Sequence, residues 1–294
     1  MEINFYKDYF SKFKISKIEL IGFLAGVKPA ILAGFYNDND IDVIKSIFAK
    51  FRLKKRPYFI NDLRERQQWL AISSDLKIAK ELMRSFLRKD FEKVGRLLGY
   101  PSCCAKRYVD DLPDQATACD ISARTMGLSS WYINNVFNPQ TRPVISDKEK
   151  DMPKLREIGN INAKTKTYPL YLISHFPCSY NCEKSIKIGR KIFEAIKKFD
   201  PADAQLTEET LKKPILFFDS YHYIVFNGMV KKNNAIIYSS ISLPKSLIPA
   251  NLFKKIEEGN KISIEEKRVV IFKRNKVKHC FKFNNITPVI LNFI

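Results

Sequence analysis

Residues 175–185 read His175-Phe176-Pro177-Cys178-Ser179-Tyr180-Asn181-Cys182-Glu183-Lys184-Ser185, and the rest of the chain is organised around this stretch. It places one imidazole and two thiols within eight residues. The residues before it, 168–173, are aromatic and apolar, as in a strand. The residues after it carry apolar side chains at helical spacing: Ile188, Ile192, Ile196 and Phe199. The pattern predicts a strand, a cysteine-bearing turn and a helix, which would present side chains at the end of the strand.

A second cysteine segment, Gly99-Tyr100-Pro101-Ser102-Cys103-Cys104, lies about seventy residues upstream. Four of the six cysteines of the chain fall in these two segments. Pro101 and Ser102 form a helix-start signature, so Cys103 and Cys104 are expected in the first helical turn. Exposed backbone N–H groups and the helix dipole favour thiolate there. We interpret the two segments as halves of one site.

The residue types in this site suit a soft metal ion. Cys178 and Cys182 are four residues apart and would share one face of a helical turn, and His175 precedes Cys178 by three. Thiolates and imidazole are ligands for zinc or for an iron–sulfur cluster. The spacing matches neither the usual zinc knuckle nor a ferredoxin. The candidate metal ligands are Cys103, Cys104, Cys178, Cys182 and His175.

We expect only one of the two adjacent cysteines at the site, because neighbouring side chains diverge. Three thiolates would leave an open position on the metal, as in catalytic sites, and His175 would fill it or act as an acid or base nearby.

Metal-free chemistry is the alternative. Cys178 would then be a nucleophile activated by His175, or Cys178 would form a redox disulfide with Cys182 or Cys103. Cys178 and His175 are therefore the catalytic candidates. Arg107 is a candidate for holding an anionic substrate or cofactor. If the cysteines of the two segments have no chemical role, we expect them to be buried thiols that pack like small apolar side chains. We prefer this interpretation for Cys119 and Cys280, each of which stands alone in its segment.

The net charge of +20 indicates a polyanionic partner, most plausibly RNA or DNA. The lysines are scattered along the chain, which also fits the Lys-, Ile- and Asn-rich bias of AT-rich coding sequences. No RNA-recognition, KH or zinc-finger spacing occurs in the sequence. Nucleic-acid binding, with RNA as the named candidate, is therefore predicted from charge alone.

The N-terminal residues do not resemble a signal peptide, and no apolar run approaches the ~20 residues that a membrane-spanning helix needs. We therefore expect a cytoplasmic protein that does not interact with membranes. Its thiols would be reduced, which favours metal binding or catalysis over disulfides. The oligomeric state is left open.

The pattern of elements predicts an α/β (α+β) protein in three parts: a mostly helical region 1–57, a cysteine-motif α/β core 58–213 and a β-rich region 214–294. We expect a buried helix over 18–33, kinked or divided by Pro29, and a helix over 40–51. We also expect a hairpin formed by 58–60 and 69–73, a helix capped by Ser74-Asp75, and a helix from Asp90 that ends at Gly99. After residue 214 we expect strands at 215–218, 222–226, 235–238, 269–272, 280–283 and 289–291, a turn at Asn227-Gly228 and a short helix over 249–257. The polar region 110–166 reads as a long cover or insert.

Together, the motifs Gly99-Tyr100-Pro101-x-Cys103-Cys104 and His175-x-Pro177-Cys178-Ser179-x-x-Cys182-x-x-Ser185 resemble those of an uncharacterised, mainly archaeal family, DUF483. The likeness covers residues 60–240 more loosely. It implies that the cysteines and His175 belong to one site, and it suggests an archaeal source. It brings no established activity.

The sequence therefore predicts a Cys/His metal or iron–sulfur protein that performs redox or group-transfer chemistry, with RNA as a candidate substrate. A zinc-stapled nucleic-acid-binding module and a metal-free thiol enzyme are the alternatives. Whether the chain is an enzyme is left open.

Overall fold

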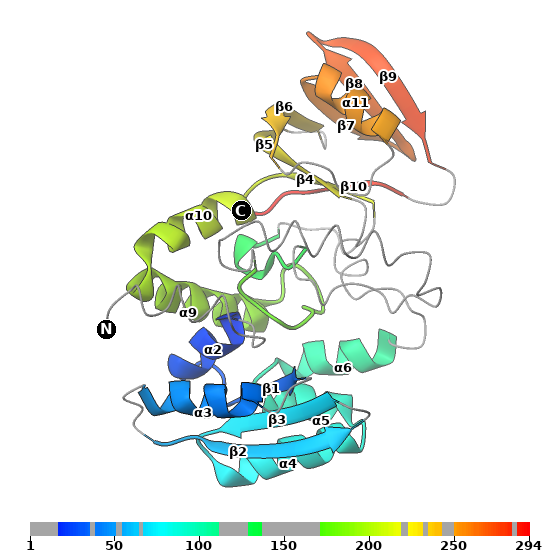
Figure 1. The fold of residues 1–294 in the computed structure, drawn as a ribbon. Helices are drawn as coiled ribbons and strands as arrows, with labels where there is room; N and C mark the ends of the chain where they lie inside the picture. Colours follow the sequence, from blue (N-terminus) through cyan, green and yellow to red (C-terminus); the bar gives the residue numbers. More distant parts are fainter. Residues whose placement is uncertain are drawn as a thin grey trace. The chain divides into compact units, whose positions relative to one another are not determined.

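The computed structural model describes residues 17–35, 39–50, 55–64, 67–111, 129–136, 171–218, 223–231, 235–242, 250–283 and 287–294 (Figure 1). Cys119 and most of the predicted insert 110–166 lie outside these residues. The chain divides into two compact units. Unit 1 comprises residues 1–113, 172–176 and 183–204, and unit 2 comprises residues 114–171, 177–182 and 205–294. The three-part division expected from the sequence stays a prediction.

Unit 1 is built on a three-stranded antiparallel sheet in the order β1-β3-β2. Its strands are β1 (Ala30–Phe35), β2 (Tyr58–Arg64) and β3 (Gln67–Ser73). Side chains alternate between the two faces of β3, as the period of a strand requires. Leu70 and Ile72 pack with Phe23 and Phe48 on one face, whereas Ala71 packs with Leu82 on the other. The sheet is therefore the middle layer between helices on both faces.

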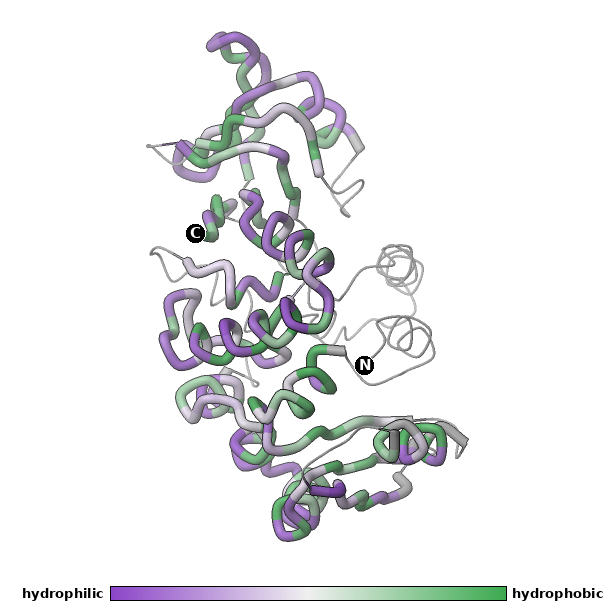
Figure 2. The backbone as a smooth tube through the Cα atoms, turned by 90° about the vertical axis from the view of Figure 1, so that its left-hand side faces the viewer, coloured by the Kyte–Doolittle hydropathy of each residue, from purple (hydrophilic) through white to green (hydrophobic). Residues whose placement is uncertain are grey.

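Helices α2 and α3 contribute to the first of these layers, and α4 and α5 contribute to the second. The helices of unit 1 are α2 (Lys17–Leu24), α3 (Asn39–Lys50), α4 (Leu76–Leu87), α5 (Phe91–Leu97), α6 (Ser102–Asp111) and α9 (Glu183–Phe199). The predicted cap of α4 is confirmed, because the Asp75 carboxylate accepts hydrogen bonds from the backbone N–H groups of Lys77 and Ile78. Figure 2 shows hydrophilic and hydrophobic residues alternating along the helices, as expected when one face of each is buried.

The helix predicted over 18–33 is wrong in its second half. Helix α2 ends at Leu24, and Gly26 adopts a φ of 69° in the turn that follows. Residues 30–35 then form β1 and pair with β3 along their whole length. A short apolar run is compatible with a buried helix and with a strand, and the pairing with β3 decides between them.

Of the strand expected over residues 168–173, residues 168–170 lie outside the described residues, and residues 171–173 do not form a strand. Tyr171, Leu172 and Ile173 are buried, as their apolar character suggested, but the segment has irregular backbone. A buried irregular segment has the same apolar sequence pattern as a strand, so the pattern led to the wrong prediction of a strand here. The turn and the long helix after it, α9, are confirmed.

Unit 2 contains a seven-stranded antiparallel sheet in the order β10-β4-β5-β6-β7-β8-β9. The strands are β4 (Ile215–Phe217), β5 (Tyr223–Lys231), β6 (Ala235–Ile241), β7 (Lys261–Glu265), β8 (Arg268–Lys273), β9 (Lys276–Lys282) and β10 (Val289–Leu291). Helix α11 (Ala250–Glu258) packs on one face through Leu252 and Ile256. The unit also holds the short 3₁₀ helix η2 (Trp131–Ile133), whereas α10 (Pro201–Leu211) begins in unit 1 and ends in unit 2.

The turn predicted at Asn227-Gly228 is instead an irregularity within β5. A Cβ at Gly228 would lie 2.1 Å from the carbonyl oxygen of Ile237, so glycine here permits a close approach of two backbones. The strands expected at 269–272 and 280–283 correspond to β8 and β9, and Arg274 and Asn275 between them both adopt positive φ. Strand β7 was not predicted.

The described residues form helices and two antiparallel sheets, with strands predominating after residue 214. The predicted fold class is therefore confirmed. None of the helices in the described part of the chain has the length and apolar character needed to cross a membrane.

Candidate metal centre

The first cysteine pair begins helix α6, where the sequence motif placed it. Gly99 ends the preceding segment with a φ of 84°, a conformation that glycine adopts without strain. Pro101 then starts the helix, and its carbonyl oxygen accepts the backbone N–H groups of Cys104 and Ala105. Cys103 is exposed and Cys104 is buried. The two thiols differ in exposure, but their Sγ atoms are only 3.9 Å apart.

The second pair lies at the two ends of the turn 177–182. The backbone N–H of Cys182 donates to the carbonyl oxygen of Ser179, which closes the turn before α9. Tyr180 anchors its middle: the ring is buried, and the hydroxyl donates to Asn135 Oδ1. Although these six residues are counted with unit 2, their chain neighbours on both sides, Phe176 and Glu183, belong to unit 1.

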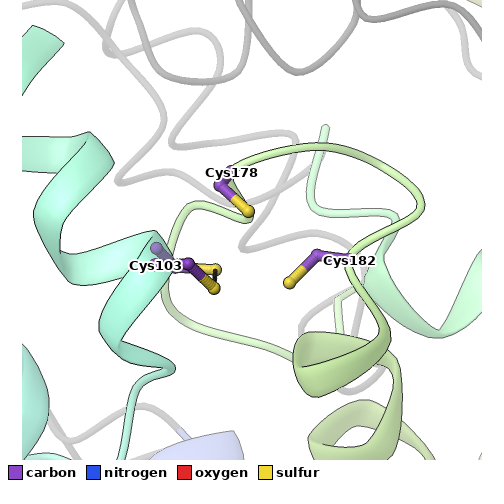
Figure 3. A group of neighbouring side chains, drawn as sticks. Cys103, Cys178 and Cys182 are labelled. Atoms are coloured by element: carbon purple, nitrogen blue, oxygen red, sulfur yellow. Dashed lines mark hydrogen bonds between the residues drawn. The ribbon is translucent and has the colours of Figure 1, made fainter.

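The Sγ atoms of Cys103, Cys104, Cys178 and Cys182 all lie within 4.8 Å of one another. Figure 3 shows those of Cys103, Cys178 and Cys182 directed toward a common point. Among the described residues, the group consists of these four thiols and includes no histidine nitrogen. Four sulfurs at this spacing can hold a metal ion.

Ser185, in the first turn of α9, connects this group to His175. Its hydroxyl lies 3.2 Å from Sγ of Cys104 and 2.8 Å from Nε2 of His175. Ser185 and His175 are both buried, so neither hydrogen bond is exposed to competition from bulk water. A hydroxyl has one proton, so it donates to one of these partners and accepts from the other.

Burial and the nearby charge of Lys28 lower the pKa of His175 to about 3. The imidazole is therefore neutral at physiological pH. The ring of Tyr100, from the first cysteine motif, lies against it with a centroid separation of 4.9 Å. His175 thus contacts Tyr100 of the first cysteine motif and Ser185 of α9.

A buried ion pair lies beside this network. Lys28 Nζ is 2.5 Å from Glu19 Oε1 and 3.1 Å from Ser174 Oγ, and it sits 4.4 Å from the centre of the Tyr100 ring. The Ser174 hydroxyl also donates to Glu19 and lies 3.3 Å from the Tyr100 hydroxyl. Burial lowers the pKa of Lys28, and the Glu19 carboxylate opposes this shift. The polar groups are therefore paired with one another in a part of unit 1 that excludes water.

The structure brings together all four predicted cysteine ligands. We expected only one of Cys103 and Cys104 at the site, but both belong to the group, because the first turn of a helix can direct adjacent thiols to the same neighbours. His175 lies outside the group and reaches it through Ser185. The catalytic roles of Cys178 and His175 stay predictions. So does the role of Arg107, which is exposed on α6.

Of the two cysteines predicted to be buried thiols, Cys280 is exposed. Its prediction is wrong because strand β9 turns Cys280 away from the face that packs on α11, where Phe281 points.

Sequence reasoning missed the residues that surround His175. Glu19, Lys28 and Ser174 were not candidates, although Lys28 stands within a mostly apolar run, and a charge that is buried with such a run needs a partner. Only the structure shows that residues 19, 28, 100 and 174 meet. The motif residue Ser185 was noted, but its contact with both His175 and Cys104 was not foreseen.

Comparison with known proteins places this site within the matched part of the chain. No curated protein and no solved structure matches the chain. Residues 69–211, which include all four cysteines of the group, match the family model described as "Protein of unknown function (DUF483)". Over these residues the chain belongs to the DUF483 family.

Proposed function

We propose that the chain binds a single zinc ion through the thiolates of Cys103, Cys104, Cys178 and Cys182, and that this ion is structural. The observation that carries the proposal is the separation of the four Sγ atoms, all within 4.8 Å. A tetrahedral zinc ion with bonds of about 2.3 Å holds its sulfurs about 3.8 Å apart. The distance of 3.9 Å between Cys103 and Cys104 agrees with that value.

The spacing favours a single ion over an iron–sulfur cluster. Sulfurs that bind a cubane cluster are roughly 6–7 Å apart, because the iron and sulfide atoms lie between them. The four thiols would have to separate to admit a cluster, whereas a single ion requires only small movements. A rubredoxin-like iron site has the same geometry as zinc and is distinguished by its colour.

The number of thiols favours a structural ion over a catalytic one. Catalytic zinc keeps a position open for water or substrate, whereas four protein ligands close the coordination shell. The group contains four thiols, so redox or group-transfer chemistry at the metal would require one of them to leave. The zinc-stapled protein predicted as an alternative from the sequence is therefore the interpretation we prefer.

The environment of Cys104 also supports metal binding. Once Cys104 is a thiolate, the Ser185 hydroxyl can donate to its sulfur, and His175 can donate to Ser185 through Nε2. Hydrogen bonds of this kind orient the ligands of zinc sites and stabilise the charge on the sulfur.

The test is elemental analysis and spectroscopy of the full chain purified without oxygen. We expect about one zinc per chain, no visible absorption, and a Co²⁺-substituted form with the thiolate charge-transfer bands of a tetrahedral site. Cys182→Ser should lower zinc content and thermal stability. Cys280→Ser is the matched control, because Cys280 is exposed on β9, and it should change neither.

Iron together with acid-labile sulfide would contradict the proposal in favour of a cluster. A protein without metal, whose four thiols react with a thiol reagent in the native state, would contradict metal binding altogether and support the thiol-enzyme alternative.

A further inference from the structure

One face of the unit 2 sheet is turned away from helix α11. Helix α11 packs on the face that carries Ile262, Val269 and Ile271 (Figure 1). The residues between these along the strands point to the opposite face, because side chains alternate. The strand pairing aligns this opposite face into cross-strand rows, of which three matter: Lys282-Arg268-Glu265, Cys280-Val270-Ser263-Ala235 and Val277-Phe272-Lys261-Ile237-Met229.

The third row exposes apolar side chains. Val277 is 60 % exposed, Ile237 39 % and Met229 59 %. Phe272 lies between Val277 and Lys261 in this row and is half-buried. The Lys261 ammonium lies 4.9 Å from the centre of the Phe272 ring. A row of exposed apolar groups across four strands is costly in water unless a partner covers it.

The strands β7, β8 and β9 are also strongly basic. Residues 261–282 contain eight lysines and arginines against two glutamates. In the part of the chain that the structure describes, none of these eight cations forms an ion pair with a carboxylate. Arg268 and Lys282 face each other across β8 and β9. Glu265 of β7 pairs in register with Arg268, but the cations of these strands outnumber the glutamates, so the sheet attracts anions.

We propose that this face binds a single strand of RNA. A base would stack on Phe272, and the other exposed side chains of that row would support neighbouring bases. The phosphates would lie against three cations. Lys231 pairs with Ala235 and so extends the second row, and Arg268 and Lys282 belong to the first row. Stacking on a sheet together with phosphate contacts at its edges is how single strands are held by sheet surfaces.

The positive charge and the partly exposed Phe272 ring together favour a single strand of RNA over other partners. A second copy of the chain would bring the same positive charges to the interface and be repelled. A duplex buries its bases and offers them no access to Phe272, whereas a single strand exposes both its bases and its phosphates. The inference does not depend on the zinc ion, since no cysteine of the metal group lies on these strands.

The test is fluorescence anisotropy of a labelled 15-nucleotide oligouridine with the full chain. The triple variant Lys231→Gln, Arg268→Gln, Lys282→Gln should weaken binding at least tenfold. It should also reduce the slope of log K against log salt by about 2, since each lost contact to a single strand contributes about 0.7. The matched control is the triple variant Lys77→Gln, Lys80→Gln, Arg88→Gln, on α4 and at its C-cap, which removes the same charge from exposed positions. It should change Kd by less than about threefold.

Stacking is tested at Phe272. Phe272→Leu should raise Kd about fivefold or more, whereas Phe272→Tyr keeps the ring and should bind like the native chain. Thermal melting of each variant identifies those that fold. The proposal is overturned if the two triple variants weaken binding equally, if folded Phe272→Leu binds normally, or if a 15-base-pair RNA duplex binds as tightly as the single strand. A dimer in sedimentation that is lost in Phe272→Leu would overturn it in favour of self-association.

Discussion

The Ser185 hydroxyl lies 3.2 Å from Sγ of Cys104, and the same oxygen lies 2.8 Å from Nε2 of His175. The side chain of Ser185 thereby connects one of the four clustered thiols to a buried imidazole. Because the hydroxyl holds a single proton, the direction of one hydrogen bond fixes the direction of the other. A thiolate at Cys104 requires the serine to donate to sulfur and the imidazole to donate to serine.

Ser185→Ala is expected to lower zinc affinity by about 10- to 100-fold, the usual effect of removing a hydrogen bond to a metal ligand. The substitution removes the hydroxyl that reaches both Cys104 and His175. Chelator competition measures the affinity. Ser179→Ala, in the turn between Cys178 and Cys182, is the control and should have little effect, because its hydroxyl donates to Asn181. Equal losses in both variants would show that Ser185 has no special role.

Protonation of His175 should make the fold less stable in acid. Its pKa is about 3 in the folded chain and near 6.5 when unfolded, so the unfolded chain binds more protons between these values. The contribution of His175 to the free energy of unfolding is therefore fully present above pH 6.5. It falls as the pH drops toward 3, by up to about 1.4 kcal/mol per pH unit.

His175→Asn keeps a polar side chain without the titration. Urea unfolding from pH 4 to 7 should give a shallower dependence on pH for this variant than for the native chain. The difference between the two proteins removes the contributions of carboxylates and thiols that both share. Parallel curves would show that the imidazole is not buried in its neutral form.

The elements that could be predicted from the sequence have local signals. Asp75 caps α4 through its own carboxylate, and Gly99 ends its segment through its own backbone freedom. Both contributions depend on the residue and its chain neighbours. The clustering of four cysteines in two motifs was likewise visible in the sequence, and the structure brings these four thiols together.

The elements that could not be predicted depend on distant partners. Residues 30–35 are a strand because β3 pairs with them, and Asn227-Gly228 stays within β5 because the backbone of β6 passes close by. The contact of Lys28 with Ser174 joins residues 146 positions apart. No pattern within one segment contains that information.

Breaking the buried ion pair from one side should be more costly than removing both partners. The side chains of Lys28 and Glu19 are 4 % and 11 % exposed. Lys28→Met leaves the Glu19 carboxylate buried without its cation and should lower the free energy of unfolding by about 3–5 kcal/mol. Adding Glu19→Gln should recover part of that loss. Urea denaturation of the two single variants and the double variant measures the coupling, and strictly additive losses would contradict it.

Gly99→Ala should destabilise the chain more than Gly26→Ala, although both glycines have positive φ. An alanine at either position adopts a left-handed conformation that costs roughly 1–2 kcal/mol. At Gly99 the new Cβ would also lie 2.6 Å from Cδ of Pro29, whose rigid ring precedes β1, whereas at Gly26 nothing lies within 4 Å. We therefore expect a loss of about 1 kcal/mol for Gly26→Ala and clearly more than about 2 kcal/mol for Gly99→Ala, measured by urea unfolding. Equal losses would mean that Pro29 moves aside freely and that Gly99 is required for its backbone conformation alone.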